Sequence, residues 1–242
     1  KNKEKKIIGY INDKPFKFDC PKKIEPTSLV LMPTLDCNYR CLYCYARSGE
    51  KKKSMSFELA KKSVDLLIDS CKKNKIIETS IMLHGGGEPF LESNWDFIEN
   101  LVSYVEKQAL INNIKISLNG ITNGYLSLKQ INFITEHFNQ LSISLDGPKE
   151  YHDKQRLHLR SDGKLEGSFD KVMNSIKEFD KRAFDYGFRA TLSKEGFQDF
   201  TRFIDFFRTE TKATGLNVEP IYSWGRQKNT NVMGPNIEDF AK

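Results

Sequence analysis

Several features that define other classes of protein are missing from this sequence. Its 242 residues contain only five cysteines, and this sparse, odd set does not supply the paired framework of a small disulfide-rich secreted domain. No apolar run approaches the ~18–20 residues needed to span a membrane, and the N-terminus lacks the pattern of a secretory signal. These absences predict a globular protein of a reducing compartment, the cytoplasm.

The charge of the chain does not select a partner. Thirty-eight Lys and Arg residues against 32 Asp and Glu residues give a net charge of +6. Lysine-rich runs such as Lys1–Lys6 and Lys51–Lys53 are typical of solvated surface, and an acidic peptide or RNA partner is the alternative interpretation. Because the first residue is not methionine, we expect the sequence to be a piece of a longer natural chain.

Strand-like and helix-like segments alternate along most of the chain. Short apolar runs predict strands, and apolar residues at helical spacing predict helices. The predicted strands are 28–35, 80–83, 114–118, 141–145, 188–192 and 216–221. The predicted helices are 56–74, 94–110, 127–137, 168–186 and 197–211, with a further helix beginning at 237. This alternation predicts an α/β fold with a parallel sheet, and six units suit a partial (β/α)6 barrel of the TIM type.

Two shorter runs precede these units. Residues 6–11 and 15–18 flank the segment 12–14, which has the pattern of a β-hairpin with an Asn/Asp turn. A connector with a proline at each end follows. We therefore predict two parts, an N-terminal β-hairpin with its connector over residues 1–27 and the partial barrel over residues 28–242.

The most informative stretch holds Cys37, Cys41 and Cys44 at the spacing C-x3-C-x2-C. Thiolates are soft ligands suited to iron–sulfur clusters, zinc or copper(I). Three thiolates can hold three irons of a cubane cluster and leave the fourth open to another ligand, whereas a ferredoxin supplies four cysteines. A zinc knuckle with His84 as fourth ligand is the alternative, although structural zinc commonly uses paired C-x2-C units.

Further motifs follow the other predicted strands. Gly85-Gly86-Gly87-Glu88-Pro89 permits a close backbone approach, and it is not a phosphate-binding loop because no Gly-Lys-Ser/Thr follows. Asn123-Gly124 follows the third strand. Ser144 alternates with apolar neighbours, so its side chain should face the barrel interior. Arg156 lies twelve residues later, and its fork suits a carboxylate. In barrels of this kind the chemistry lies at the C-terminal strand ends, where these motifs should meet.

Together, the ordered motifs resemble those of the radical S-adenosylmethionine (SAM) enzymes. An aromatic residue precedes the third cysteine, and the glycine motif, Thr122-Asn123-Gly124 and Ser142–Pro148 follow in order, with His152-Asp153 and Arg156 behind them. The set resembles the branch that holds anaerobic sulfatase-maturating enzymes and SPASM-type peptide-modifying enzymes. The resemblance covers about residue 28 to the C-terminus. It implies an enzyme that cleaves SAM reductively at a [4Fe–4S] cluster and abstracts hydrogen from a peptide or protein residue.

The resemblance also implies site residues. The cluster ligands would be Cys37, Cys41 and Cys44. The SAM-binding residues would be Tyr43, Gly85, Gly86, Gly87, Glu88, Asn123, Ser144, Arg156 and Leu216. In this assignment the glycine motif binds the methionine amino group, Ser144 and Arg156 bind the carboxylate and ribose, and Tyr43 and Leu216 contact adenine. No catalytic residue beyond this site is assigned.

Each of these assignments has a structural alternative. The glycine run, Asn123 and the segment 146–148 are also good turn sequences. Arg156 is alternatively a surface arginine, and core packing equally accounts for Leu216 and for the ring of Tyr43.

The resemblance implies partners as well. These are a peptide or protein substrate and an electron donor such as flavodoxin or ferredoxin. Relatives carry later cysteines for auxiliary [4Fe–4S] clusters, but here only Cys20 and Cys71 remain, interpreted as a plain thiol and a core residue. We therefore expect any auxiliary clusters in a region after residue 242, and slow, uncoupled SAM cleavage by this piece alone. A radical SAM enzyme acting on RNA or a small molecule, and a zinc-bearing binding module, are the alternatives.

Overall fold

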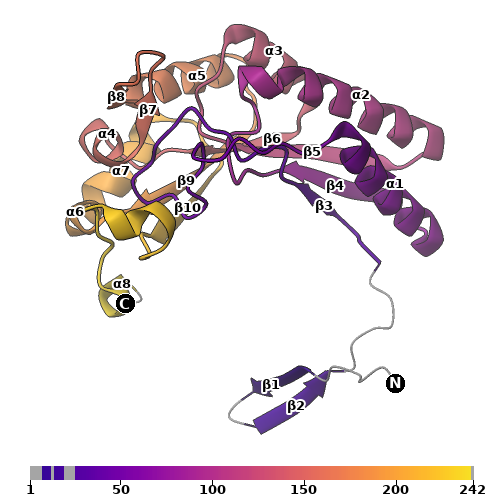
Figure 1. Cartoon of the computed structure of the whole chain (residues 1–242), viewed down its shortest axis with the longest axis horizontal. Coiled ribbons are helices and arrows are strands. Elements are labelled where there is room, and N and C mark those ends of the chain that lie inside the picture. The colour runs from indigo at the N-terminus through magenta and orange to yellow at the C-terminus, as the bar shows by residue number, and fades with distance from the viewer. Residues whose placement is uncertain (1–6, 12–13, 19–24, 241–242) are drawn as a thin grey trace.

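A six-stranded parallel sheet forms the centre of the computed structural model, which describes residues 7–11, 14–18 and 25–240 (Figure 1). The strand order is β10-β9-β6-β5-β4-β3. The strands are β3 (Leu29–Leu31), β4 (Glu78–Leu83), β5 (Lys115–Thr122), β6 (Gln140–Ser144), β9 (Tyr186–Leu192) and β10 (Gly215–Pro220). Every neighbouring pair is parallel, which confirms the predicted partial barrel.

Helices connect successive strands, and α1, α2, α3 and α5 cover the convex side of the sheet in Figure 1. The longer helices are α1 (Phe57–Asn74), α2 (Trp95–Asn112), α3 (Leu128–His137), α5 (Phe169–Lys181) and α7 (Phe200–Glu210). The shorter ones are η1 (Glu92–Asn94), α4 (Lys149–Gln155), α6 (Lys194–Gln198), η2 (Gly225–Asn229) and α8 (Ile237–Phe240). Because all six strands run parallel, their carboxyl ends lie at the same edge of the sheet.

Capping side chains fix where two of these helices begin. The Ser56 hydroxyl accepts a hydrogen bond from the backbone of Leu59 at the start of α1. Ser127 and Gln130 form a reciprocal capping box at the start of α3. Both helices begin within one residue of their predicted starts, because these local signals act independently of the rest of the fold.

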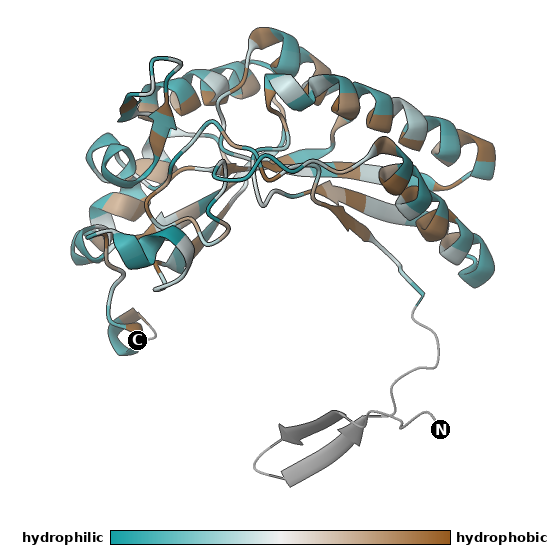
Figure 2. Cartoon of the chain, viewed as in Figure 1, coloured by the Kyte–Doolittle hydropathy of each residue, from teal (hydrophilic) through white to brown (hydrophobic). Residues whose placement is uncertain are grey.

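The hydrophobic core lies between the sheet and the helices. In α1 the core face consists of Ala60, Val64, Leu67 and Ile68. Leu59, in the first turn of the helix, is 53% exposed. Figure 2 shows hydrophilic and hydrophobic residues alternating along α1 and α2, as expected of helices that bury one face.

The predicted long loop after β6 is the largest difference from the sequence-based elements. It contains α4 and a two-stranded hairpin of β7 (Leu157–Leu159) and β8 (Leu165–Gly167). The following helix, α5, ends at Lys181 rather than Tyr186, since Ala183 adopts a left-handed φ of 50° and β9 begins three residues later. The predicted helix 197–211 is divided into α6 and α7.

The predicted N-terminal hairpin is present. Strand β1 (Ile7–Ile11) pairs antiparallel with β2 (Lys14–Phe18), in a register that joins Ile7 to Phe18 and Ile11 to Lys14. The predicted turn residues Asn12 and Asp13, and Cys20, lie outside the described residues. Within the part of the chain that is described, no helix has the length and apolar character required to cross a membrane.

Candidate functional site

A cavity of about 410 Å³ opens at the carboxyl ends of the strands. Its lining comes from the loops after β3 and β4 and from the ends of β5, β6, β9 and β10. Of the predicted site residues, eleven line this cavity: Cys37, Cys41, Tyr43, Cys44, Gly85, Gly86, Gly87, Glu88, Asn123, Ser144 and Arg156. The structure therefore brings together motifs that are spread along the sequence from Cys37 to Arg156.

Leu216 is the exception among the predicted site residues. It is partly buried and packs against the hydrophobic core rather than lining the cavity. Glu219 and Pro220, at the end of β10, line the cavity. Leu216 and Val218 lie earlier in the strand and both pack against the core, so core packing, the structural alternative, accounts for Leu216.

The three cysteines lie on the cysteine loop, defined here as residues 35–50. All three are free thiols. Burial, with a smaller contribution from the neighbouring thiols, raises the pKa of Cys37 to about 12 and that of Cys41 to about 11. Binding to iron displaces these protons, since the thiolate is the ligand.

The placement of the thiols distinguishes between the two metal sites considered for them. Among the described residues, no three Cys, His, Asp or Glu side chains are grouped as a single metal ion requires. In a cubane cluster each thiolate binds a different iron, so its sulfurs stand farther apart than around one zinc ion. The three free thiols share the cavity with His84, but among the described residues they do not form the closed ligand set of structural zinc. An open set of three thiols is what a cubane cluster with a free iron position would need.

Backbone hydrogen bonds hold one side of the cysteine loop against the segment after α4. Residues 38–42 run beside residues 155–159. The bonds are Arg40 N–H to the Leu157 carbonyl (2.7 Å), Leu42 N–H to the Gln155 carbonyl (2.8 Å) and Leu159 N–H to the Asn38 carbonyl (2.8 Å). The hairpin that was predicted as loop thus supports the cysteines.

The glycine motif approaches the cysteine loop closely. The Gly87 N–H donates to the Thr34 carbonyl at 3.0 Å, and the Glu88 N–H donates to the Asp36 carbonyl at 2.8 Å. A Cβ on Gly87 would lie 2.0 Å from the Asp36 carbonyl oxygen. The Ser48 hydroxyl also donates to the Gly86 carbonyl. The motif therefore needs glycine for contact between the two loops, whatever else it binds.

Glu88 is buried and tied to the end of β5. Its Oε1 accepts hydrogen bonds from the Thr122 hydroxyl (2.8 Å) and the Phe90 N–H (3.2 Å), and its Oε2 accepts from the Asn123 N–H (2.6 Å). Burial raises the pKa of Glu88 to about 7, although these donors act in the opposite direction. Asn123 in turn donates to the Asn38 side chain at 2.8 Å, which connects the β5 end to the cysteine loop.

Asp146 is the centre of a second buried network. Its carboxylate accepts from the Tyr43 hydroxyl (2.7 Å), the Gln155 amide (2.7 Å) and the Thr191 N–H (2.9 Å). Burial raises the pKa of Asp146, while Arg156 acts to lower it. The segment 146–148 was interpreted as a turn, yet Asp146 joins the cysteine loop to β9.

Arg156 is buried, and not all of its hydrogen-bond donors are used. Its Nη1 donates to the Tyr43 hydroxyl at 2.6 Å, and its guanidinium lies 5.8 Å from the Tyr39 ring centroid. Within the described residues its buried Nε has no hydrogen-bond partner. Neighbouring thiols, Tyr43 and Asp146 keep the pKa of Arg156 well above its usual value despite burial. A buried, charged donor on the wall of a cavity fits an anionic ligand group such as a carboxylate.

His152 supports Arg156 from behind. The Asp146 N–H donates to His152 Nδ1 at 3.2 Å, so the ring proton is on Nε2, which donates to the Ser168 hydroxyl at 2.9 Å. Ser168 donates in turn to the Arg156 carbonyl at 2.7 Å. Burial, Arg156 and Lys149 hold the pKa of His152 well below its usual value, so the ring is neutral.

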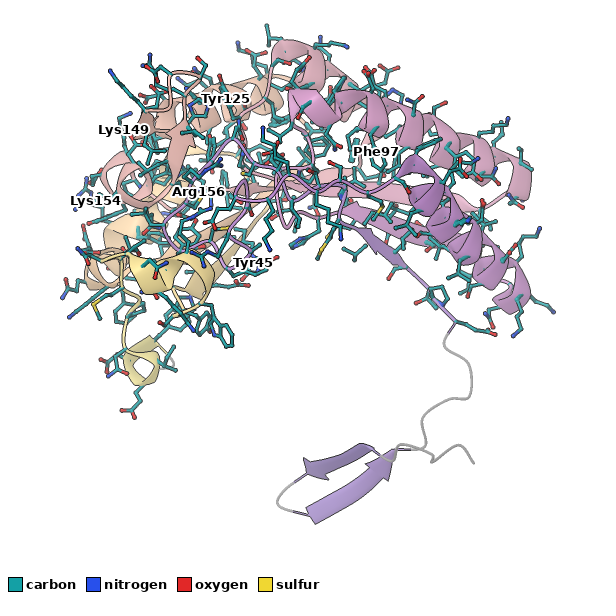
Figure 3. All side chains as sticks on the ribbon, viewed as in Figure 1. Tyr45, Phe97, Tyr125, Lys149, Lys154 and Arg156 are labelled. Carbon is teal, nitrogen blue, oxygen red and sulfur yellow. The ribbon has the colours of Figure 1, made fainter. Side chains whose placement is uncertain are left out.

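Sequence reasoning did not identify several residues of the cavity. Arg189 on β9 donates to both carboxylate oxygens of Glu219 on β10, at 2.7 and 2.8 Å. The alternation of side chains along a strand, which placed Ser144 in the barrel interior, would also have placed Arg189 and Glu219 there, but it was not applied to β9 and β10. Tyr45, Tyr222 and Trp224 are largely exposed at the rim. Figure 3 labels Arg156 within the fold and Tyr45 below it, toward the open side.

The sequence matches a family model and several known proteins. A model of the Radical SAM superfamily matches residues 31–207. The chain is 29% identical over 190 residues to the cysteine-type anaerobic sulfatase-maturating enzyme of Clostridium novyi (strain NT), covering 77% of this chain and 49% of that enzyme. It is 29% identical over 218 residues to uncharacterized protein MJ0907 of Methanocaldococcus jannaschii, covering 88% and 68%.

The fold is also similar to solved structures. A structure of anSMEcpe with bound AdoMet and the Cp18Cys peptide has a TM-score of 0.70 and 24% identity, covering 81% of this chain and 51% of that one. The chain spans about half the length of this protein and of the Clostridium enzyme.

Proposed function

Because this chain belongs to the radical SAM superfamily, we propose that it abstracts hydrogen from a residue of a peptide or protein substrate. It is a radical SAM enzyme, and the cofactors of the superfamily are a [4Fe–4S] cluster and SAM. One observation carries the proposal: three free cysteines, the glycine motif and Arg156 line a single cavity.

When bound, the cluster and SAM would supply the one-electron reductive cleavage of SAM that leads to hydrogen abstraction from the substrate. The protein holds and orients the groups involved. Cys37, Cys41 and Cys44 would hold three irons. The buried guanidinium of Arg156 would bind the SAM carboxylate, with Ser144 beside it on the cavity wall.

The remaining predicted residues would contact SAM through backbone atoms or hold neighbouring residues in place. The glycine motif would offer backbone oxygens to the methionine amino group, next to the cysteine loop that it contacts. Glu88 holds Thr122 and Asn123 at the end of β5. The backbone of Tyr43 would meet the adenine, and its hydroxyl holds Arg156 and Asp146 in place.

The substrate class rests on the relatives and on the open side of the cavity. One relative is a sulfatase-maturating enzyme, and one structure of similar fold holds a peptide. In this chain the exposed rings of Tyr45, Tyr222 and Trp224 surround the mouth. Behind them the Arg189–Glu219 pair offers one charge of each sign. Aromatic and paired polar groups at a mouth suit an extended peptide.

The electron donor and the cellular location follow from the same proposal. Reduction of the cluster requires a low-potential donor, for which a flavodoxin or ferredoxin is suited. Unpaired cysteines and an iron–sulfur cluster require a reducing compartment, which in the cell is the cytoplasm.

The test is anaerobic turnover with both products followed together. The reconstituted protein is supplied with reductant, SAM and peptides that contain a single cysteine or a single serine, with the alanine versions as controls. We expect slow, uncoupled release of 5′-deoxyadenosine from the 242 residues alone, and a mass change, confined to the Cys or Ser peptide, when they are tested within a chain as long as the matched relatives. Production of 5′-deoxyadenosine with RNA or a small molecule, but with none of the peptides changed, would contradict the substrate class and leave the enzyme class intact.

A further inference from the structure

Arg226 contributes to none of the motifs above, yet it is bound to the cysteine loop at four points. Its side chain is 12% exposed. Nη1 donates to the Cys41 carbonyl (2.8 Å), Nη2 to the Ser48 carbonyl (2.7 Å) and Nε to the Glu50 carboxylate (3.1 Å). The backbone N–H of Arg226 donates to the Cys44 carbonyl at 3.0 Å. The residue thus contacts the carbonyls of two of the three cysteines.

The preceding glycine makes this contact possible. Gly225 has a φ of +56°, and a Cβ on it would lie 2.4 Å from the carbonyl oxygens of both Cys44 and Tyr45. A side chain there would force the backbone of η2 away from the cysteine loop. The sequence Gly225-Arg226 therefore combines a close backbone approach with a donor fork that reaches across the loop.

The cysteine loop needs such donors because it has little regular secondary structure. Its partly buried carbonyl groups lack the partners that a helix or a sheet would supply. On its inner side Arg40 donates to the carbonyls of Cys37 (2.7 Å), Tyr39 (2.8 Å) and Gly49 (3.1 Å). Residues 155–159 hold one flank of the loop, and Arg226 holds the other.

We propose that Arg226 is a positioning residue for the cluster: it fixes the cysteine loop in the conformation that binds iron, and it joins that loop to the cavity wall that carries Tyr222 and Trp224. The part that concerns the cluster rests on the proposed function. The fixing of the loop is a property of the chain itself. Arg226 lines the same cavity as the three cysteines, so its positive charge would favour the reduced state of a cluster held there, which carries one more negative charge.

The first experiment uses the protein before iron is added. Alkylation of Cys37, Cys41 and Cys44 by iodoacetamide is followed by mass spectrometry in the unchanged protein, R226Q, R226K and R208Q. Arg208 is the matched control, an exposed arginine of α7 paired with Asp205. We expect about tenfold faster alkylation in R226Q, the factor that corresponds to ~1.4 kcal/mol of lost loop stabilisation. R226K should show a smaller increase, and R208Q none.

The second experiment follows the reconstituted cluster. R226Q should lose iron to a chelator faster than the unchanged protein, and its cluster should have a more negative midpoint potential. G225A keeps the arginine but displaces the backbone, so it should alkylate faster, as R226Q does. Equal alkylation and equal iron loss in R226Q and the unchanged protein would overturn the proposal.

Two outcomes separate this inference from the proposed function. If the unchanged protein takes up no iron, the proposed function fails, and alkylation still decides whether Arg226 fixes the loop. If R226Q does not fold, alkylation of R226K decides: a rate above that of the unchanged protein supports the inference, and an equal rate overturns it.

Discussion

The Tyr43 hydroxyl donates a 2.7 Å hydrogen bond to the Asp146 carboxylate across 103 positions of sequence. The same hydroxyl accepts a 2.6 Å hydrogen bond from Arg156. One phenol therefore lies between a buried acid and a buried base, and it joins the cysteine loop to the ends of β6 and α4. The shape of this wall of the cavity therefore depends on Tyr43.

Replacing Tyr43 with phenylalanine should destabilise the fold. The change leaves Asp146 and Arg156 each without one buried partner, which costs about 1–3 kcal/mol of unfolding free energy. Denaturant unfolding measures the effect. Tyr45→Phe is the control, since Tyr45 is 63% exposed on the same loop, and it should change the unfolding free energy by less than about 0.5 kcal/mol. Equal effects of the two changes would contradict the network.

Replacing Cys41 with alanine should abolish the cluster. The anaerobically reconstituted protein should be brown and oxygen-sensitive with roughly four irons per chain, as a [4Fe–4S] cluster requires. Cys71→Ala is the matched control, because Cys71 is a free cysteine in the core face of α1 and should leave the iron content unchanged. Stoichiometric zinc with no uptake of iron would favour the zinc-binding alternative.

Removing the Arg156 guanidinium should weaken SAM binding without removing the cluster. Loss of a charge-assisted hydrogen bond to a carboxylate costs about 1.5–3 kcal/mol, which anaerobic calorimetry measures as a lower affinity for SAM in Arg156→Ala. Arg156→Lys keeps the charge and should lose less. Arg160→Ala, an exposed arginine of the neighbouring hairpin, is the control. Unchanged SAM affinity in Arg156→Ala at full iron content would argue against the assignment.

The lowered pKa of His152 predicts that the folded chain loses stability in acid. Its pKa in the folded chain lies well below the usual 6.5 because of burial, Arg156 and Lys149. Below pH 6.5 the unfolded chain therefore binds a proton at His152 that the folded chain does not, and the unfolding free energy falls by up to ~1.4 kcal/mol per pH unit. Above pH 6.5 neither state is protonated there, and the effect disappears.

The measurement compares the unchanged protein with His152→Gln between pH 7 and 5. Glu88, whose pKa is raised to about 7, acts in the opposite direction, but it is common to both proteins and cancels in the difference. We expect the stability advantage of the unchanged protein to shrink as the pH falls. Parallel pH profiles would show that His152 binds protons equally in the folded and unfolded chains, and would contradict the lowered pKa.

Local signals explain why so much of the fold was predictable. The capping residues Ser56 and Ser127 fix where α1 and α3 begin, and apolar periodicity identified all six strands of the sheet. The segment 146–167 was not predictable because its α4 and short β7–β8 hairpin are stabilised by contacts with the cysteine loop. Such tertiary contacts leave no local pattern in the sequence.

Part of the candidate site could likewise be predicted from the sequence, and part could not. Motif residues such as Cys37 and Arg156 could be predicted because chemistry restricts residue type and order, and the structure places them on one cavity. Leu216 packs against the core and does not line the cavity; the sequence left both interpretations open because an apolar residue in a strand fits either face. Arg226 and Asp146 were not identified, since a single arginine after a strand and an aspartate in a turn carry no pattern of their own.

Replacing Gly87 with alanine should disrupt the contact between the glycine motif and the cysteine loop. The new Cβ would lie 2.0 Å from the Asp36 carbonyl oxygen, a distance that backbone atoms cannot accommodate without moving. The cost is about 1–3 kcal/mol or more of unfolding free energy, and iron uptake should fall because the cysteine loop moves as well.

Gly215→Ala is the matched control, since a Cβ there meets nothing within 4 Å. It should be neutral or stabilise the fold by up to ~1 kcal/mol. Thermal unfolding and iron analysis of the two variants test the argument, and equal stability and iron content in both would show that the two loops do not depend on each other.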